Sequence, residues 1–107
     1  MMFIAMNHFQ VAPERAEEFE AVWRSRESYL GNVSGFVRFA LLKGDEAGEY
    51  ISHSTWESRE AFLGWAQSEA FRRAHASPMP EGIVIGHPRA RFYDAVLEET
   101  APSRSLA

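Results

Sequence analysis

Three residues set far apart in the chain carry side chains that could act together on a bound cofactor: Asn7, Trp65 and His75. The imidazole of a histidine is a common ligand for iron and other metals. A tryptophan offers a large rigid surface against a flat ligand, and an asparagine amide can orient a small bound group through hydrogen bonds. The three residue types therefore outline a cofactor site, provided that the fold brings them together.

Each of the three also has an interpretation that needs no ligand. His75 follows two arginines near the end of a predicted helix, where a histidine is often a favourable cation for the helix dipole. Trp65 lies among other apolar residues at helical spacing, and spacing alone favours a core aromatic. Asn7 is harder to explain in this way, because a buried amide without partners costs about 1–3 kcal/mol.

A resemblance to a known family favours the functional interpretation. The segment from Trp56 to His75, together with Asn7, resembles the heme-degrading monooxygenases (IsdG type) of the antibiotic biosynthesis monooxygenase superfamily, over most of residues 3 to 76. In that family the matching histidine binds heme iron, the tryptophan presses on the porphyrin and distorts it, and the asparagine directs bound oxygen. The resemblance thus implies that Asn7, Trp65 and His75 are catalytic and cofactor-binding residues, with His75 as the metal ligand.

The activity implied by the resemblance is oxidative opening of heme with O2 and external electrons, which releases iron and a linear tetrapyrrole. Heme would be substrate and cofactor at once, and the external reductant could be an electron-donating reductase. Arg72 is expected to bind the cofactor by facing a heme propionate, although a basic pair near a helix C-terminus needs no ligand.

Two other functions stay open at this point. The first is a cofactor-independent monooxygenase of polycyclic phenols or quinols, in which asparagine and tryptophan serve without an iron ligand, so that His75 would be dispensable. The second is a non-catalytic heme-binding or stress-response protein of the same fold. The remaining histidines, His8, His53 and His87, lack the close spacing of zinc ligands and are expected at the surface or at an interface.

Composition limits the class of protein. The chain has 107 residues, enough for one compact core, and we expect one domain over residues 1–97. Its 15 acidic and 11 basic residues offer no basic stripe for nucleic acid. The absence of cysteine excludes disulfides, iron–sulfur clusters and a thiolate-ligated heme. The sequence has no basic leader and no apolar run of about 18 residues, so we expect a cytoplasmic protein without membrane contact.

The hydrophobic pattern predicts four strands and three helical pieces. Residues 3–11 alternate as a strand does, which turns Asn7 toward an apolar face. Pro13 suits the first turn of a helix whose apolar stripe extends to Leu30. The other predicted elements are strands over 36–43 and 49–56, helices over 58–66 and 68–76 with Ser77-Pro78 as the stop, and a last strand within 83–97 that His87-Pro88 interrupts or starts; residues 98–107 are expected to form a disordered tail.

The break between the two later helices bears on the site. On one straight helix, Trp65 and His75 would point about 80° apart around the axis, because each residue turns the helix by about 100°. Ser68 is a plausible cap for a second helical piece. A bend near Gln67 and Ser68 is therefore expected to turn the two side chains toward one ligand.

The predicted order βαββαβ is that of a ferredoxin-like α+β fold, in which both helices cover one face of a four-stranded antiparallel sheet. The other face would then expose apolar side chains such as Ile4 and Met6, and a large apolar face is an association surface. The family resemblance implies that two sheets pack face to face in a homodimer, as a dimeric α+β barrel.

Overall fold

A computed structural model describes residues 1–26, 28–76 and 79–102. Four strands and three α-helices follow one another in the order βαββααβ, with short 3-10 helices before and after the first α-helix. The elements are β1 (Phe3–Val11), η1 (Pro13–Arg15), α1 (Ala16–Ser25), η2 (Leu30–Asn32), β2 (Phe36–Lys43), β3 (Glu49–Trp56), α2 (Arg59–Ala66), α3 (Glu69–Ala74) and β4 (Val84–Asp94).

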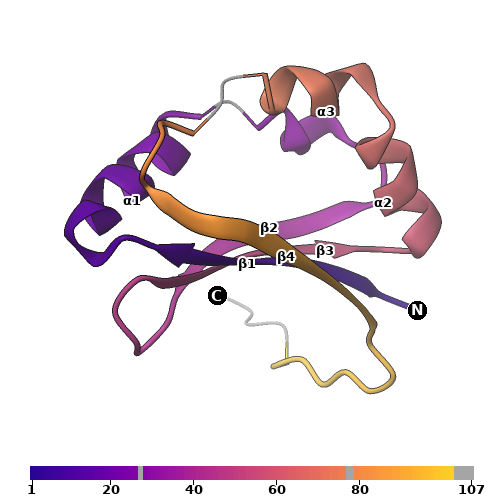
Figure 1. The fold of residues 1–107 in the computed structure, drawn as a ribbon. Coiled ribbons are helices and arrows are strands. Elements are labelled where there is room, and N and C mark those ends of the chain that lie inside the picture. The colour runs from indigo at the N-terminus through magenta and orange to yellow at the C-terminus, as the bar shows by residue number, and fades with distance from the viewer. Residues whose placement is uncertain (27, 77–78, 103–107) are drawn as a thin grey trace, which may run out of the picture.

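The strands form one antiparallel sheet in the order β2-β3-β1-β4, and the helices lie over a single face of it (Figure 1). With α2 and α3 counted as one broken helix, this arrangement confirms the predicted ferredoxin-like α+β fold. Asn7 belongs to the row of β1 that faces the helices, as its alternation predicted, because it lies opposite Ser52 and Ala90 on the neighbouring strands and all three line cavities under the helical layer.

Two apolar clusters hold the helices on the sheet. One lies under α2 and α3 around Phe3, Trp56 and Trp65, and the other lies under α1 around Phe19 and Tyr50. Among the described residues the buried core is entirely apolar or aromatic. Because the helices rest on two separate clusters, the space between those clusters is left for a cleft.

The first helix is shorter than its apolar stripe predicted. It ends at Ser25, and Arg26 is already extended. Tyr29 has a φ of 62°, a left-handed conformation that interrupts any right-handed helix. Leu30 is still buried, but it begins the short helix η2 and packs under α2 and α3. The helical period was thus misleading: Leu30 belongs to the core without belonging to the helix.

The predicted break in the second helical region is confirmed. The helix α2 ends at Ala66 and α3 starts at Glu69, with Ser68 between them as the N-cap of α3. The Ser68 hydroxyl accepts a hydrogen bond from the Phe71 N–H at 3.1 Å and donates one to the Trp65 carbonyl at 2.7 Å. One side chain therefore ties both helix ends together. The predicted stop at Ser77-Pro78 lies outside the described residues.

The last strand is irregular where the sequence predicted an interruption. Its register with β1 shifts between the pairs His8–Arg89 and Gln10–Ile85, so β4 carries two extra residues around Gly86. Gly86 has a φ of 71°, which favours glycine. The strand ends at Asp94, earlier than the predicted limit near residue 97. Residues 103–107 of the predicted tail lie outside the described part of the chain.

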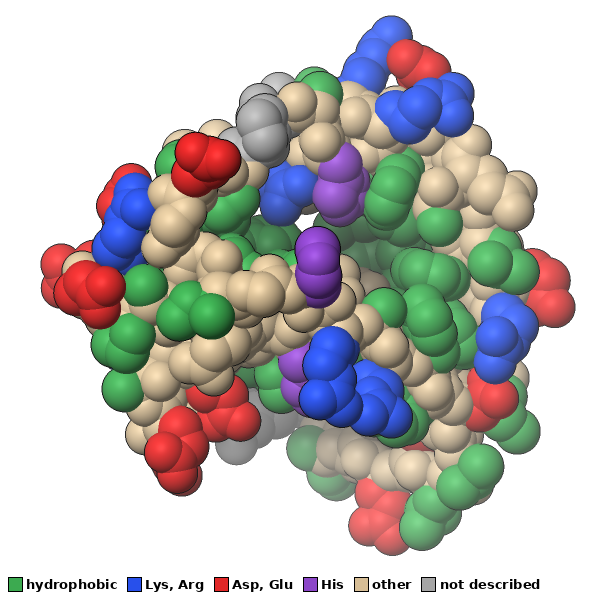
Figure 2. Space-filling model, viewed as in Figure 1, with side chains coloured by type: hydrophobic (Ala, Val, Ile, Leu, Met, Phe, Trp, Pro, Cys, Tyr) green, Lys and Arg blue, Asp and Glu red, His purple; other side chains and the backbone are tan. Residues whose placement is uncertain are grey.

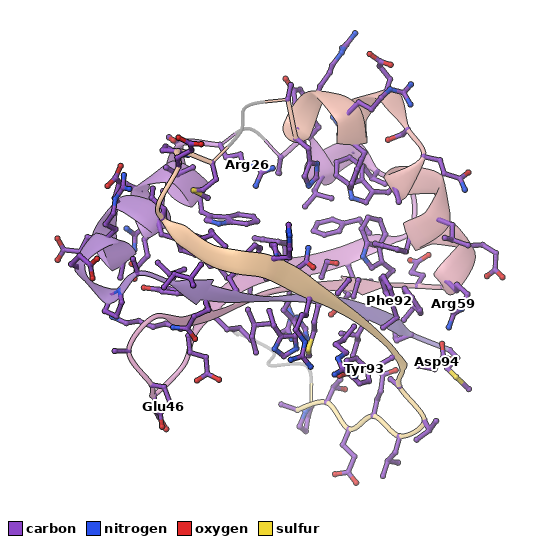
Figure 3. All side chains as sticks on the ribbon, in the orientation of Figure 1. Arg26, Glu46, Arg59, Phe92, Tyr93 and Asp94 are labelled. Atoms are coloured by element: carbon purple, nitrogen blue, oxygen red, sulfur yellow. The ribbon has the colours of Figure 1, made fainter. Side chains whose placement is uncertain are left out.

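The face of the sheet that the helices leave bare, the open face, mixes apolar and basic side chains. Successive residues of a strand alternate between faces, and directly paired residues share one. The register thus assigns to the open face the apolar residues Ile4, Met6, Ala40, Leu42, Ile51, Ile85 and Tyr93 and the basic residues His8, Arg38, His53, Arg89 and Arg91. Figure 3 shows the alternation at the neighbours Phe92 and Tyr93, which lie on opposite sides of β4.

Candidate functional site

A cleft lies between the helical layer and the sheet, and Figure 2 shows the molecule hollowed there. It has two lobes. The apolar lobe, about 430 Å³, is walled by aromatic residues, among them Trp56, Phe62, Trp65, Phe71 and Phe92. The polar lobe, about 670 Å³, is lined by residues that include Ser25, Tyr29, Arg73, Met79 and Pro88. Both lobes share Asn7, Trp23, Arg26, Ala74 and His75, and their volumes are typical of small-molecule sites.

His75 closes α3 as its C-cap residue and lies on the wall of both lobes. Its Nδ1 is 2.8 Å from the Phe71 carbonyl oxygen, and its ring stacks on the Phe71 ring with centroids 4.0 Å apart. A carbonyl oxygen can only accept, so this contact assigns the proton to Nδ1 and leaves the Nε2 lone pair available. A histidine oriented in this way is prepared to bind a metal through Nε2.

Trp65 is both a core residue and part of the cleft. Its side chain is only 7% exposed, stacks on Trp56 with centroids 6.3 Å apart and meets the edge of Phe71 at 5.5 Å. It also lines the apolar lobe. The break at Ser68 therefore turns Trp65 and His75 toward one space. Phe71 contacts both rings, and all three residues line the apolar lobe.

Asn7 approaches the cleft from the sheet, opposite the helical wall. It is half-buried and lines both lobes. Among the residues that the structure describes, its amide forms no hydrogen bond to another side chain or to the backbone. Its neighbours across the sheet are Ser52 and Ala90. The amide is therefore free to bond a ligand or water in the cleft, which is what a polar orienting group needs.

Arg26 is a site residue that the sequence did not indicate. Its Nε donates to the Ala74 carbonyl at 3.0 Å, and its guanidinium lies 4.6 Å from the centroid of the Trp23 ring. Figure 3 shows it between the helical layer and the sheet. Burial lowers the pKa of Arg26, and no ion pair links it to a carboxylate of the described residues. A partly desolvated cation on a cleft wall attracts an anionic ligand group.

Trp23 is the second site residue that sequence reasoning missed. It falls in the apolar stripe predicted for the first helix, and such a stripe by itself favours a core position. In the structure it lines both lobes, stacks on Phe39 at 5.7 Å and leaves its indole Nε1 buried without a hydrogen-bond partner among the described residues. No signal in the spacing separates such a wall residue from a core residue.

Arg72 does not line either lobe. Its guanidinium is exposed and pairs with Glu69 at 2.8 Å, while Arg73 does line the polar lobe. Binding of a propionate by Arg72 stays a prediction. In the described part of the chain, no cluster of three or more His, Asp or Glu side chains could hold a metal ion, so a metal bound in this cleft would depend on its own ligand set plus a single imidazole. No described helix is long and apolar enough to cross a bilayer.

The fold and the cleft agree with a family-level comparison. Residues 2–77 match the family described as antibiotic biosynthesis monooxygenase. The chain therefore belongs to this family, and the resemblance inferred from the segment around Trp65 and His75 is confirmed.

Three relatives are similar to this chain over most of its length. The chain is similar to the mycobilin-producing heme oxygenase of Mycobacterium tuberculosis, with 33% identity over 89 residues that cover 80% of this chain and 82% of the relative. It is also similar to a structure of the heme-degrader MhuD from that organism with two hemes in its active site, with a TM-score of 0.74, 27% identity and coverage of 92% and 99% of the two chains. A MhuD variant with two manganese protoporphyrin IX per active site gives a TM-score of 0.77, 25% identity and the same coverage.

Proposed function

We propose that this protein is a heme-degrading monooxygenase that binds heme in the cleft through His75 and opens the porphyrin with O2 and external electrons. Iron and a linear tetrapyrrole would be the products. The observation that carries the proposal is the oriented imidazole, whose Nδ1 is held by the Phe71 carbonyl while Nε2 stays available on the wall of an aromatic lobe. The named activities of the similar mycobacterial proteins support it.

The residues of the cleft fit a flat, apolar and dianionic ligand. The aromatic walls of the apolar lobe suit a macrocycle, which buries most of its surface in apolar contacts. The polar lobe offers Arg26, a cation without a carboxylate partner among the described residues, to an acidic substituent. Heme brings this combination in one molecule, since its ring is apolar and its propionates are charged.

The proposed roles follow from where each side chain lies. His75 would hold the iron, because Nε2 carries the free lone pair. Trp65 would press on the ring, since its stack on Trp56 prevents it from yielding. Asn7 would donate a hydrogen bond from the sheet side and so direct the site of oxidation. When bound, heme supplies the redox chemistry, and the protein supplies position and electrostatics.

We propose further that the protein acts as a cytoplasmic homodimer with an external reductase or other reductant. The open face supports the dimer. Several of its apolar side chains stay exposed, including Leu42 at 43%, Ile85 at 53% and Tyr93 at 46%. Burial of such a face against a second copy would remove a large apolar area from water. The absence of cysteine fits a reducing compartment.

A hemin titration tests the ligand assignment. The wild type should bind about one hemin per chain, as a first saturable step, with the Soret spectrum of a histidine-ligated heme. His75→Ala should lose that spectrum. His87→Ala removes an exposed histidine of β4 and is the matched control, so it should behave as the wild type does. A His75→Ala protein with the wild-type spectrum and affinity would exclude His75 as the ligand.

Turnover tests the reaction itself. With O2, a reductant and catalase to remove free peroxide, bound heme should lose its Soret band, and a chelator should capture the released iron. If heme stays intact under these conditions, the protein is a heme carrier and the proposed reaction is wrong. If hemin does not bind but polycyclic phenols are oxidised, the cofactor-independent activity replaces the proposal.

A further inference from the structure

The open face carries a cluster of basic side chains among its apolar ones. The basic cluster consists of Arg38, Arg89, Arg91, His8 and His53. His8 lies directly opposite Arg89, and Met6 lies between Arg91 and His53 in the register. The described acidic residue of this face is Glu49, which pairs with Gln10 at the far end of β1. If two open faces packed together, each would bring three arginines into the interface. Their burial would cost free energy unless anionic groups paired with them.

The segment that follows β4 supplies both negative charge and unused apolar surface. This C-terminal arm, residues 95–102 in the described part of the chain, starts where the Ala95 N–H donates to the Met2 carbonyl at 2.9 Å. Val96 and Leu97 are 86% and 80% exposed. Glu98 and Glu99 are exposed too and form no ion pair with any other described residue. Figure 1 shows the arm turning back on the open side of the sheet.

We propose that in the dimer the C-terminal arm of each protomer lies across the basic cluster of its partner. Val96 and Leu97 pack against apolar side chains of the partner's open face, and Glu98 and Glu99 pair with its arginines. This inference rests on the proposed dimer and adds to it a reciprocal clasp that joins the protomers by charge as well as by apolar contact.

The arm is long enough for this contact. Packed sheets lie about 10 Å apart, and an extended chain advances at most about 3.3–3.6 Å per residue. Counted from the anchored Ala95, Glu98 can thus reach about 10 Å and Glu99 about 14 Å. The carboxylates of Glu98 and Glu99 can therefore reach a second sheet that is packed against the open face.

The balance of charge also favours the partner's sheet as the destination. Each arm brings two carboxylates to a face with three arginines and, on that face, one described carboxylate at the far edge. Pairing across the interface offsets the repulsion that two basic faces would otherwise feel. It also predicts that added salt weakens the dimer, because exposed ion pairs are screened.

Engineered cysteines test the contact directly, since the native chain has none and every disulfide formed is informative. Chains with Glu98→Cys are mixed with isotope-labelled chains that carry Arg38→Cys, Arg89→Cys or Arg91→Cys, left to exchange subunits and then oxidised. At least one mixture should give a disulfide between a labelled and an unlabelled peptide, because a disulfide needs Cα atoms within about 7 Å. Glu17→Cys, at an exposed position of α1, replaces Glu98→Cys as the control and should give none.

Removal of residues 96–107 provides the second measurement. Sedimentation should show the dimer dissociation constant raised at least about fourfold, since two exposed ion pairs would be lost at each of two arms. The double variant Glu98→Lys, Glu99→Lys should weaken the dimer in the same direction. The clasp is wrong if the wild type sediments as a dimer yet no mixture forms the disulfide and the truncated chain dimerises equally well. A wild-type monomer would instead reject the dimer, and the clasp with it.

Discussion

Asn7 and His75 meet the cleft from opposite walls, one from the sheet and one from the helical layer. A substitution at Asn7 should therefore separate the reaction from binding. Asn7→Ala is expected to keep the histidine-ligated heme spectrum and to slow heme loss by about 10- to 1000-fold, which is typical for the loss of one oriented polar contact. Soret decay with O2, reductant and catalase measures the rate.

The control for Asn7→Ala is Gln10→Ala, which alters the same strand on its open face. It should degrade heme at the wild-type rate. Equal rates for Asn7→Ala and the wild type would show that the amide has no role in the reaction. Loss of heme binding would show that the amide is needed to bind heme.

Some residues that line the cleft could be singled out from the sequence and others could not, for identifiable reasons. Trp65 and His75 emerged through the resemblance, since their spacing alone suits a core aromatic and a helix cap. Trp23 was hidden because a cleft wall and a core obey the same helical period. Arg26 was hidden because its spacing carries no signal for a cleft: on a helix that continued to Leu30 it would fall within the apolar stripe, between Trp23 and Leu30. In the structure the helix ends at Ser25 and Arg26 is extended, and a hydrophobic pattern does not record this change of backbone conformation.

At the scale of elements, the joint between α2 and α3 decides whether His75 and the aromatic wall face one cavity. Ser68→Ala removes the N-cap of α3 and the bond to the Trp65 carbonyl. It should lower the free energy of unfolding by about 1 kcal/mol and weaken hemin binding, because His75 ends the helix that Ser68 starts. Urea unfolding and hemin titration measure the two effects.

Ser58→Ala is the matched control for the joint. It removes the N-cap of α2, whose hydroxyl accepts from the Ala61 N–H, and leaves α3 intact. Both variants should lose similar stability, but only Ser68→Ala should lose affinity. Equal losses of affinity would assign the effect to general destabilisation of the helical layer.

Tyr50 gives the other helix, α1, a pH-dependent anchor. Its hydroxyl donates to the Glu20 carboxylate, and burial together with this contact raises the pKa of Tyr50 to about 12. A pKa raised on folding stabilises the protein below the unfolded value near 10, and the contribution is lost as the pH rises toward 12. Tyr50→Phe should thus flatten the fall in unfolding free energy between pH 10 and 12. Tyr29→Phe, at an exposed tyrosine, should keep the wild-type slope.

At the scale of the whole molecule, the order of the elements along the chain and the ferredoxin-like fold were predictable from the sequence, whereas the dimer is still a prediction. Alternation in residues 3–11 and the short turn between the predicted strands 36–43 and 49–56 depend on local chemistry, so they could be recognised without a structure. The partner of the open face depends on a surface match between two copies, which no period in one chain records.

Charge placed on the open face tests the dimer. Leu42 on that face and Leu63 on α2 are each 43% exposed, which makes them a matched pair. Leu42→Asp should give a monomer by sedimentation, because the carboxylate would be buried in the interface. Leu63→Asp should remain a dimer. If both variants keep the wild-type mass, the open face is not the interface.

Because β4 carries an even number of extra residues near Gly86, the side chains beyond the insertion keep their faces of the sheet. In a strand, a single inserted residue exchanges the two faces for everything beyond it, whereas a pair of inserted residues restores them. Here Ile85 and Arg89 stand on either side of the insertion and both remain on the open face, while Gly86 and Pro88 reshape the mouth of the cleft. An insertion of one or three residues at this point would exchange the side chains of the open face with those of the covered face, whereas an insertion of two changes the mouth of the cleft and keeps the open face the same.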